Sequence, residues 1–404
     1  MSSTAATGVV ILGAARTPIG RYGGTLRDTH PAELGASAAK AALARCGVAP
    51  DAVDEVLIGH GRQAGSGPNP ARQTGRRSGL PDSVPAQTIN QACASGLQAI
   101  ALGAQAIQTG QSSVVLSGGI ESMSRMPYLM DSEDARWGHK MGNFTLVDAM
   151  YRDGFFCPLS QLVMGQTAEV LARQYGITRD ESDAFALSSQ KKAEAAIAAG
   201  RFTEEITPAP GKDAKGKPVD LTSDEHPRAG ATIEGLRKLP VVFEPVEGVS
   251  GIITAGSSSG VTDGGAAVVL SSEAGAAKRG QTPLARILGW ATTGVDPRMM
   301  GIGPVPAVRK LLQKTGLGLE DFDLVEINEA FAPQVLAVLR DLPIDPARVN
   351  VNGGAIALGH PIGCTGTRIV VTLLHEMKRR QARLGLATLC VSGGLGMAMA
   401  FESI

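Results

Sequence analysis

The sequence predicts an α/β protein made of two similar halves, with a long segment inserted between them. Buried strand patterns alternate with small-residue helix patterns near both ends of the chain, as in sheets covered by helices on both faces. Two strand patterns run into the same tripeptide, Ser-Gly-Gly, at residues 117–119 and 392–394, which indicates an internal duplication. Because strand, helix and strand follow one another, we expect parallel sheets.

The first half is expected at residues 1–123 and 250–283, with its elements marked by apolar runs and helical spacing. Its strands are predicted at Gly8–Ala15, Val53–Ile58, Ser113–Gly119 and Gly265–Leu270. Its helices are predicted after Pro31, from Ala71 to Arg77 and from Leu97 to Gln108.

The second half, residues 284–404, repeats this plan. Strands are predicted at Leu284–Gly289, Phe322–Asn328 and Ala387–Gly394, and helices at Val305–Thr315 and after Gly366. Residues 124–249 lack the alternation, are richer in charge, Pro and Met, and contain one amphipathic helix pattern at Asp180–Ala199. A long insertion on a glycine-rich scaffold is typical of a lid, so we interpret 124–249 as a lid domain.

The composition excludes several classes of function. Lys plus Arg and Asp plus Glu both number 38, which argues against nucleic-acid or membrane-surface binding. No apolar run approaches the roughly 18 residues that span a bilayer, and Met1–Thr7 lacks the features of a secretion signal. Five scattered cysteines without a CxxC pair favour free thiols and a cytoplasmic protein. The histidines show no metal-ligand spacing, so no metal is expected.

A single cysteine, Cys93, stands between an extended run, Ala86–Asn90, and the helix predicted from Leu97. A sulfur at a helix N-terminus meets backbone N–H groups and the positive end of the helix dipole, which favour its thiolate. This position suits a nucleophile. Free cysteines are also among the most buried residues, and from this segment alone the two interpretations are equally open.

The duplicated half offers a partner for this thiol. His360 follows a glycine-rich turn and precedes Pro361, and its unperturbed pKa lies nearest neutrality among the side chains. If the two turns face each other, Cys93 and His360 converge at strand-end loops, where α/β sheets place their sites. A core or capping histidine is the lesser alternative. For Cys390, taken alone, a small buried residue at a strand end is the better interpretation.

Five segments in order resemble signature segments of the thiolases, and the resemblance covers nearly all of the chain. They are Asn90-Gln-Ala-Cys-Ala-Ser-Gly96, Ser117-Gly-Gly-Ile-Glu-Ser-Met-Ser124, Asn328-Glu-Ala-Phe-Ala332, Gly353–Gly366 and Cys390-Val-Ser-Gly-Gly-Leu-Gly396. The resemblance implies a duplicated five-layer fold, two similar sheet and helix halves packed on each other, with an inserted lid domain.

The resemblance also implies a division of catalytic roles. Cys93 would carry the acyl group and His360 would activate it. Cys390 would be the base that removes an α-proton from the second thioester. His360, with a water held by Asn328, would stabilise the enolate oxygen, and the backbone N–H groups of Cys93 and Ser392 would stabilise the tetrahedral intermediate.

Coenzyme A thioesters would be the substrates, with no cofactor, and the contacts implied are Met164, Arg228 and Ser259. Arg228 would meet the nucleotide end and Ser259 the pantetheine amide, while Phe331 resembles the residue that lines the acyl tunnel. For Arg228 a solvated surface arginine, and for Met164 core packing, are equally good interpretations.

Three residues depart from the family pattern. Ser392 replaces a common glycine, Val163 replaces the histidine of short-chain synthetic members, and Ser257 replaces a common asparagine. A side chain at 392 could restrict φ or crowd the oxyanion site. Val163 leaves the acyl-chain preference open.

The activity implied is that of an acetyl-CoA C-acetyltransferase, assembled as a homodimer or homotetramer that binds acyl-CoA and CoA. The alternative is a degradative 3-ketoacyl-CoA thiolase that prefers longer chains. A carrier-protein ketosynthase is disfavoured by the Asn-Glu-Ala-Phe segment and Cys390. A non-catalytic lipid-binding homologue is disfavoured because every reactive side chain is present.

Overall fold

The computed structural model describes residues 7–404, so most of the segment Met1–Thr7 lies outside the described residues. Nine strands follow one another in a continuous hydrogen-bonded path, β14-β15-β16-β13-β1-β12-β5-β3-β4, and the short β2 (Gly20–Arg21) pairs with β12. The first-half strands are β1 (Val9–Arg16), β3 (Glu55–His60), β4 (Ala86–Ile89), β5 (Val114–Ser122) and β12 (Thr262–Ser272). The second-half strands are β13 (Ala285–Gly294), β14 (Leu324–Ile327), β15 (Leu384–Val391) and β16 (Leu395–Ser403).

The expectation of parallel sheets is wrong for the centre of this path. Only the outer pairs β14–β15, β3–β5 and β3–β4 are parallel, whereas β1, β12, β13 and β16 join their neighbours antiparallel. Helices cover both faces of each half, so central strands of either orientation are apolar throughout. An apolar strand pattern therefore could not separate the two arrangements.

The predicted ends of two strands also differ from the structure. β5 does not stop at the glycine pair 118–119 but continues to Ser122, paired with β12. β15 ends at Val391, before the second Ser-Gly-Gly, which instead forms the turn into β16. Gly393 and Gly394 adopt φ values of +88° and +85° there, a region that glycine occupies without steric cost.

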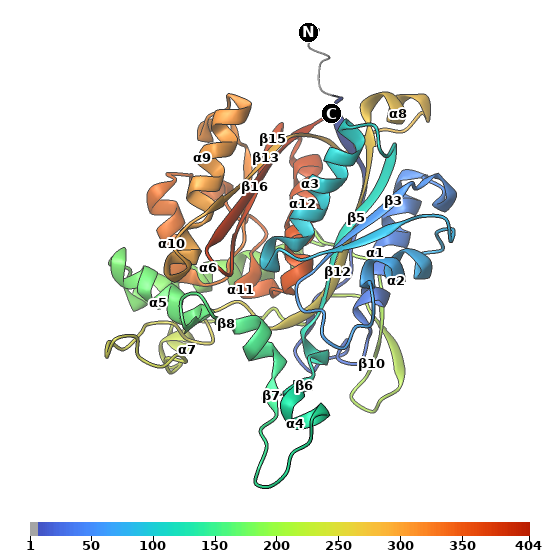
Figure 1. Ribbon diagram of the computed structural model, residues 1–404. Coiled ribbons are helices and arrows are strands. Elements are labelled where there is room, and N and C mark those ends of the chain that lie inside the picture. Colours follow the sequence, from blue (N-terminus) through green and yellow to red (C-terminus); the bar gives the residue numbers. More distant parts are fainter. Residues whose placement is uncertain (1–6) are drawn as a thin grey trace, which may run out of the picture.

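Helices and sheets form five layers, which appear side by side across Figure 1. The helices α1 (Pro31–Cys46) and α2 (Pro70–Arg77) cover one outer face, and α9 (Pro304–Thr315) and α10 (Ala332–Asp341) cover the other. Between the two halves lie α3 (Ser95–Gln108) and α12 (Ile362–Arg380). The duplicated five-layer fold expected from the family resemblance is confirmed.

The two central helices touch through their first turns. A Cβ placed on Gly96 of α3 would lie 2.6 Å from Thr367 Oγ1 and 2.9 Å from the Gly363 carbonyl oxygen, both on α12. Such separations are below any ordinary van der Waals contact, so only glycine permits this approach. The contact brings the residues that precede the two helices, Cys93 and His360, into one region.

Residues 124–249 leave the layered body and return to it. An arm, residues 128–148, contains β6 (Tyr128–Leu129), α4 (Ser132–Arg136) and β7 (Val147–Asp148), and it projects at the bottom of Figure 1. The chain then forms a π-turn, Tyr151–Phe155, and the hairpin β8 (Phe156–Cys157) and β9 (Leu162–Val163).

In the later part of this segment, two helices pack on the second half, whereas the hairpin of residues 209–221 packs on the first half, beside α1. The helices α5 (Met164–Gln174) and α6 (Arg179–Ala198) lie against α10 and α11 (Ala355–Leu358). A capping box between Thr178 and Glu181 starts α6. The hairpin consists of β10 (Ala209–Lys212) and β11 (Pro218–Leu221), and α7 (Ile233–Arg237) follows it in the same segment. Outside the segment, α8 (Glu273–Lys278) follows β12. Across residues 7–404, no helix has the length and apolarity needed to cross a membrane.

Candidate active site

Cys93 lies in a single 3-10 turn, Ala92–Ala94, between β4 and the first residue of α3. Ala92 adopts a φ of +45°, a conformation that non-glycine residues rarely adopt and that is concentrated at functional sites. The Asn90 side chain accepts a hydrogen bond from the Ala92 N–H at 2.9 Å, and the Ser95 hydroxyl donates to the Ala92 carbonyl at 2.6 Å. The turn thus holds Cys93 in place at 9% exposure.

Burial dominates the electrostatics of this thiol. It raises the pKa of Cys93 above its ordinary value, and the opposing effects are the charge of Arg62 and the backbone N–H groups of Ser392 and Cys93 itself. Glu121 raises the pKa of Cys93 further. The expectation that the helix start alone favours the thiolate therefore does not hold for the resting site, because loss of water outweighs the helix terminus.

Cys390 occupies the end of β15, at 1% exposure. Its pKa is also raised, first by burial and then by the neighbouring Cys93, so the two thiols share one buried site. Ser392 follows by two residues, and its backbone N–H lowers the pKa of Cys93. Six non-glycine residues in the described chain have a positive φ, and Ser392 is not one of them. The Cβ of Ser392 therefore causes no backbone strain.

His360 lies between α11 and α12, at 7% exposure. Its Nδ1 is 2.6 Å from the Thr365 hydroxyl oxygen, which itself donates to the Pro361 carbonyl at 2.9 Å. Since that hydroxyl proton is already used, Nδ1 carries the ring proton and Nε2 keeps a lone pair. Burial, Arg368 and Arg62 lower the pKa of His360 to about 3, so the ring is neutral at physiological pH.

Asn328 faces the Nε2 side of this histidine. Its Nδ2 is 3.4 Å from His360 Nε2, and its backbone N–H donates to the Thr388 carbonyl at 3.0 Å. The Oδ1 atom is fully buried and has no protein partner within the described chain. Buried carbonyl oxygens are nearly always hydrogen-bonded, so this atom is suited to hold an ordered water.

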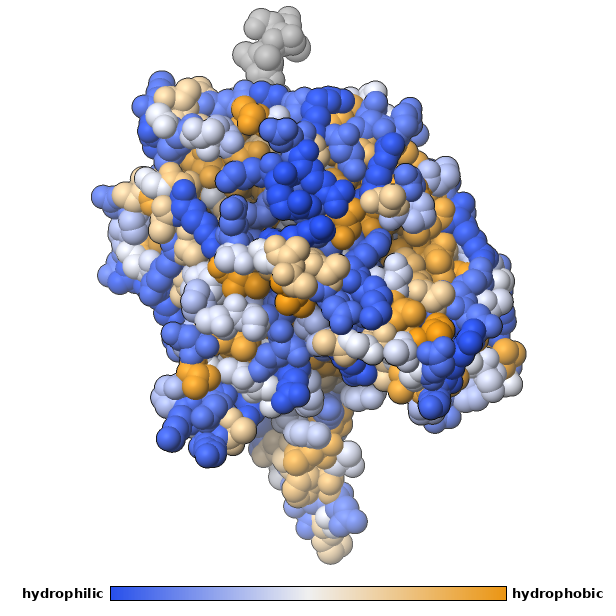
Figure 2. Space-filling model, turned by 180° about the vertical axis from the view of Figure 1, so that it is seen from behind, coloured by the Kyte–Doolittle hydropathy of each residue, from blue (hydrophilic) through white to orange (hydrophobic). Residues whose placement is uncertain are grey.

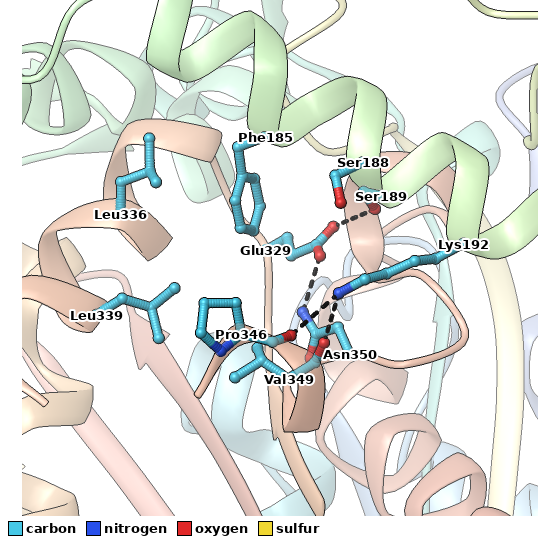
Figure 3. Close-up of a pocket in the computed structure, with 10 residues that line it drawn as sticks. All are labelled: Phe185, Ser188, Ser189, Lys192, Glu329, Leu336, Leu339, Pro346, Val349 and Asn350. Atoms are coloured by element: carbon cyan, nitrogen blue, oxygen red, sulfur yellow. Dashed lines mark hydrogen bonds between the residues drawn. The ribbon is translucent and has the colours of Figure 1, made fainter. Parts of the chain in front are cut away.

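Glu329, the next residue, fixes the position of the segment that carries Asn328. Its carboxylate accepts hydrogen bonds from the Ser189 hydroxyl at 2.7 Å, the Asn350 amide at 2.8 Å and the Ile356 N–H at 3.1 Å. Figure 3 shows Glu329 beside a cavity of about 140 Å³ between α6 and α10, together with two of these bonds. This role of Glu329 is not predicted from the sequence, although the acid directly follows Asn328 in the signature segment.

Glu121 connects the site to the first half. Its carboxylate accepts hydrogen bonds from the Arg62 N–H at 3.2 Å and the Gly363 N–H at 2.9 Å, and it lies 3.1 Å from His60 Nε2. Burial raises the pKa of Glu121, but His60, Arg62 and the Gly363 N–H lower it more, so the net pKa lies below its usual range. The side chains of Glu121, His60 and Arg62 are not identified as functional from the sequence.

Two of the substrate contacts expected from the sequence lie beside the thiols. Met164 begins α5, Phe331 precedes α10, and both belong to one apolar cluster with Cys390 and Cys157. The Phe331 ring packs edge-on against Phe243, with ring centroids 6.0 Å apart. This cluster forms an apolar wall on the Cys390 side of the site.

Ser259 and Arg228 lie on adjoining segments. The Ser259 N–H donates to the Ala330 carbonyl at 3.0 Å, and the next residue, Gly260, accepts a hydrogen bond from the His360 N–H at 3.0 Å. Gly260 is covered by the ring of His226. Arg228 follows two residues later, with an exposed side chain and a backbone N–H that donates to Gln190 Oε1 at 3.1 Å. No direct contact brings Arg228 to the thiols.

The other two departures from the family pattern have local explanations. The buried Ser257 hydroxyl oxygen accepts a hydrogen bond from the Thr254 N–H at 3.0 Å and so closes its own turn. Val163 caps α5, and its N–H donates to Gln166 Oε1 at 3.1 Å. Within residues 7–404, no three His, Cys, Asp or Glu side chains are grouped to hold a metal ion.

Comparisons with known proteins agree along the whole chain. The family model described as Thiolase, N-terminal domain, matches residues 9–274, and Thiolase, C-terminal domain, matches residues 281–403. An acetyl-CoA acetyltransferase of Pseudomonas aeruginosa is 52% identical over 391 residues, 97% of this chain and 98% of its own. One from Escherichia coli K12 is 50% identical over 395 residues, 98% and 99% of the two chains.

Solved structures give the same result. The crystal structure of the Bacillus anthracis acetyl-CoA acetyltransferase is 46% identical, with a TM-score of 0.95 and 100% of both chains covered. Human mitochondrial 3-ketoacyl-CoA thiolase in complex with CoA is 45% identical, with a TM-score of 0.93 and 98% of each chain covered.

The geometry of His360 predicts its protonation state. Because its pKa is lowered to about 3, the ring should remain neutral, with the proton on Nδ1, from pH 5 to pH 8. Nitrogen-15 NMR of histidine-labelled protein, assigned with His360→Gln, reports both properties. Thr365→Val removes the acceptor for Nδ1–H and should shift the tautomer ratio, whereas Thr365→Ser should not. A His360 ring that titrates between pH 5 and pH 7 would contradict this arrangement.

Proposed function

Because the chain belongs to the thiolase family, we propose that it is an acetyl-CoA C-acetyltransferase. It joins two molecules of acetyl-CoA, reversibly, into acetoacetyl-CoA and CoA through an acetyl group on Cys93. The observation that carries the proposal is the placement of two buried thiols, with Cys93 in the turn before α3 and Cys390 on β15, which packs against that turn. The curated relatives described above bear the same name. The reaction uses side chains and thioester substrates, without a resident metal or cofactor.

In the first half-reaction the Cys93 sulfur attacks the carbonyl carbon of acetyl-CoA. The lone pair on His360 Nε2 takes the thiol proton, as a general base. The N–H groups of Cys93 and Ser392 stabilise the oxyanion, at roughly 3 to 4 kcal/mol for a preorganised donor. The C–S bond to CoA then breaks, and Cys390 gives its proton to the leaving sulfur. The result is acetyl-Cys93, a protonated His360 and a Cys390 thiolate.

In the second half-reaction the Cys390 thiolate removes an α-proton from a second acetyl-CoA. Protonated His360 Nε2 and a water on Asn328 Oδ1 stabilise the enolate oxygen. The enolate carbon attacks the acetyl carbonyl on Cys93, and the same two N–H groups stabilise the tetrahedral oxyanion. When the C–S bond to Cys93 breaks, His360 returns its proton to Cys93. Cys93, Cys390 and His360 are then back in their starting protonation states.

We place the CoA moiety along the surface that leads from these thiols over the lid segment. Ser259, close in sequence to the Gly260 carbonyl that holds His360, would contact the pantetheine part. The exposed Arg228 would meet the nucleotide phosphates, and Met164 and Phe331 would border the acyl group. The neighbour solved with CoA has the same fold, which supports a CoA substrate.

The alternative function, a degradative 3-ketoacyl-CoA thiolase with longer-chain preference, has less support. The curated relatives described above are acetyl-CoA acetyltransferases, although a 3-ketoacyl-CoA thiolase is nearly as similar in structure. The rings of Phe243 and Phe331 pack on each other in the apolar cluster that contains Cys390, and we propose that these bulky rings favour a short acyl group.

Substrate length can be tested directly. The kcat/KM for thiolysis of acetoacetyl-CoA should be at least about tenfold above that for a ketoacyl-CoA with an eight-carbon chain. A steric cost of about 1.4 kcal/mol in the transition state of the longer substrate is enough to give this ratio. Phe331→Ala should narrow the ratio by opening the wall. A preference for the longer substrate would establish the alternative.

The covalent intermediate provides the test of mechanism. After incubation with acetyl-CoA, peptide mass mapping should find an acetyl group on Cys93 and on no other cysteine, because Cys93 is the nucleophile of the proposed mechanism. Cys390→Ala should still acetylate Cys93 but should not exchange the α-protons of acetyl-CoA with deuterium. An enzyme that turns over without acetyl-Cys93 would rule out the mechanism, and retained exchange would require another base.

We also propose that the protein is a homo-oligomer, with the arm in contact with a second copy. The arm carries the exposed apolar residues Tyr128, Trp137, Met141, Phe144 and Leu146. Figure 2 shows apolar side chains on this projecting part of the surface. Apolar groups gathered on a projecting segment are typical of protein contacts. The strand β4 lies at one end of the sheet path, so its outer edge offers a second contact, besides the arm, for a strand of another copy.

Solution mass tests this assembly. Light scattering should give a multiple of 41.6 kDa, and the double substitution Trp137→Glu and Met141→Glu should lower it, because charge in the contact opposes burial. The control Val219→Glu, an exposed residue outside the arm, should leave the mass unchanged. A wild-type monomer, or an arm variant of unchanged mass, would contradict the proposal.

A further inference from the structure

Arg16 ends the strand β1 and is a fully buried cation, with 0% of its side chain exposed. Its guanidinium binds two carboxylates that both belong to the inserted segment, residues 124–249. Nη1 and Nη2 donate to the two Asp224 carboxylate oxygens at 2.7 and 3.0 Å, and Nε donates to Glu205 Oε1 at 2.5 Å. Burial lowers the pKa of Arg16, but the charges of Asp224 and Glu205 raise it more. The two acids thus compensate a buried charge that would be costly alone.

Asp224 joins the inserted segment to the chain that follows β1. Its Oδ1 atom accepts a hydrogen bond from the Ile19 N–H at 2.8 Å, and the Glu225 N–H donates to the Ile19 carbonyl at 2.9 Å. The Glu225 carboxylate accepts a further hydrogen bond from the Thr25 hydroxyl. Arg16, Asp224 and Ile19 therefore form one connected group.

Ile19 lies against the residue that precedes His360. Gly359 adopts a φ of +102°, and a Cβ placed on it would lie 3.0 Å from Ile19 Cγ2 and 2.5 Å from Thr262 Cγ2. Both the conformation and the space at this position suit glycine alone. The backbone that leads into His360 is therefore supported by a residue whose own backbone is fixed by Asp224.

His226, two residues after Asp224, supports the same backbone. Its Nδ1 is 2.8 Å from the Ala357 carbonyl oxygen in α11, and its ring lies so close to Gly260 that a Cβ there would clash. The Gly260 carbonyl accepts the His360 N–H at 3.0 Å. Two residues of one short loop, Asp224 and His226, thus support the turn that carries His360.

The second carboxylate reaches the helix that follows His360. Glu205 Oε1, which accepts the hydrogen bond from Arg16 Nε, also accepts one from the Thr372 hydroxyl on α12 at 3.1 Å. The two backbones are joined as well, because the Arg16 N–H donates to the Glu205 carbonyl at 2.9 Å. Arg16 is therefore linked, through one acid each, to the turn before His360 and to the helix after it.

We infer that Arg16 is a positioning residue, whose two ion pairs fix the place of His360 in the candidate site. It acts through Asp224 on the turn before the histidine and through Glu205 on α12. This role rests on the proposed function, in which His360 takes and returns the Cys93 proton. Proton transfer requires the base to lie within hydrogen-bond reach, so a looser turn should slow the chemical step and leave the binding of CoA unchanged.

The kinetic test is thiolysis of acetoacetyl-CoA by Arg16→Lys and Asp224→Asn. Lysine keeps the positive charge but cannot bind two acids with a rigid fork, and asparagine keeps an acceptor for the Ile19 N–H but loses the ion pair. Each variant should have a kcat about tenfold below that of the wild type, with the KM for CoA within about twofold. Circular dichroism checks folding at the assay temperature, and Asp224→Asn supplies the result if the lysine variant does not fold.

Glu376→Gln is the matched control, because Glu376 is also a buried acid in ion pairs with arginines but lies near the other end of α12. It should keep the kcat of the wild type. A second measurement needs no turnover. The nitrogen-15 shifts of the His360 ring should change in Arg16→Lys and Asp224→Asn and should stay the same in Glu376→Gln.

A kcat equal to that of the wild type in both variants would overturn the inference. An equal loss of kcat in Glu376→Gln would also overturn it, because that would indicate a general loss of stability, and so would a raised KM for CoA at unchanged kcat. A wild type without thiolysis would contradict the proposed function. The nitrogen-15 shifts would then still decide whether Arg16 positions His360.

Discussion

The close contact between α3 and α12 determines where the candidate site lies. Each helix begins directly after a reactive residue, and the Gly96 contact with Thr367 and Gly363 presses the two helix starts together. A larger side chain at this contact would separate the helices, and with them Cys93 from His360. The proposed mechanism depends on this distance, because it moves a proton between the two residues in each half-reaction, and misplacement of about 1 Å can cost about 100-fold in rate.

Enclosure by both halves also sets the charge of the resting site. Burial raises the pKa of both thiols and lowers that of His360, so the three reactive groups are neutral before substrate arrives. In the proposed mechanism, charge then develops during the reaction beside the N–H groups of Cys93 and Ser392, which already lower the pKa of Cys93. Donors fixed in advance around a dry site need no reorganisation. Glu329 contributes from outside, because its three hydrogen bonds hold the segment that carries Asn328.

Much of this arrangement could be predicted from the sequence, because the duplication is visible in the strand and turn patterns. The two turns with Cys93 and His360 are predicted to face each other, and the turn that carries Cys93 does pack against α12, the helix that follows His360. The pairing of Glu121 with His60 and Gly363 could not be predicted from the sequence, because His60 lies 61 residues and Gly363 lies 242 residues from Glu121 along the chain. The pKa of Cys93 was misjudged for a related reason. A helix start is visible in a sequence, whereas the burial that outweighs it depends on the opposite half.

The two Ser-Gly-Gly segments show how the duplicated halves came to differ. In the first half, Ser117–Gly119 continues as a regular strand against β12, and the extra residues carry Glu121 to the start of α12. In the second half, the chain reverses at the same tripeptide, since Gly393 and Gly394 adopt positive φ. That reversal leaves Cys390 near the strand end and Ser392 just after it, where the Ser392 N–H lowers the pKa of Cys93. In the proposed mechanism, one tripeptide thus supports the helix that follows His360 in one half and supplies an oxyanion donor in the other. Two halves with the same turn would lack one of these functions.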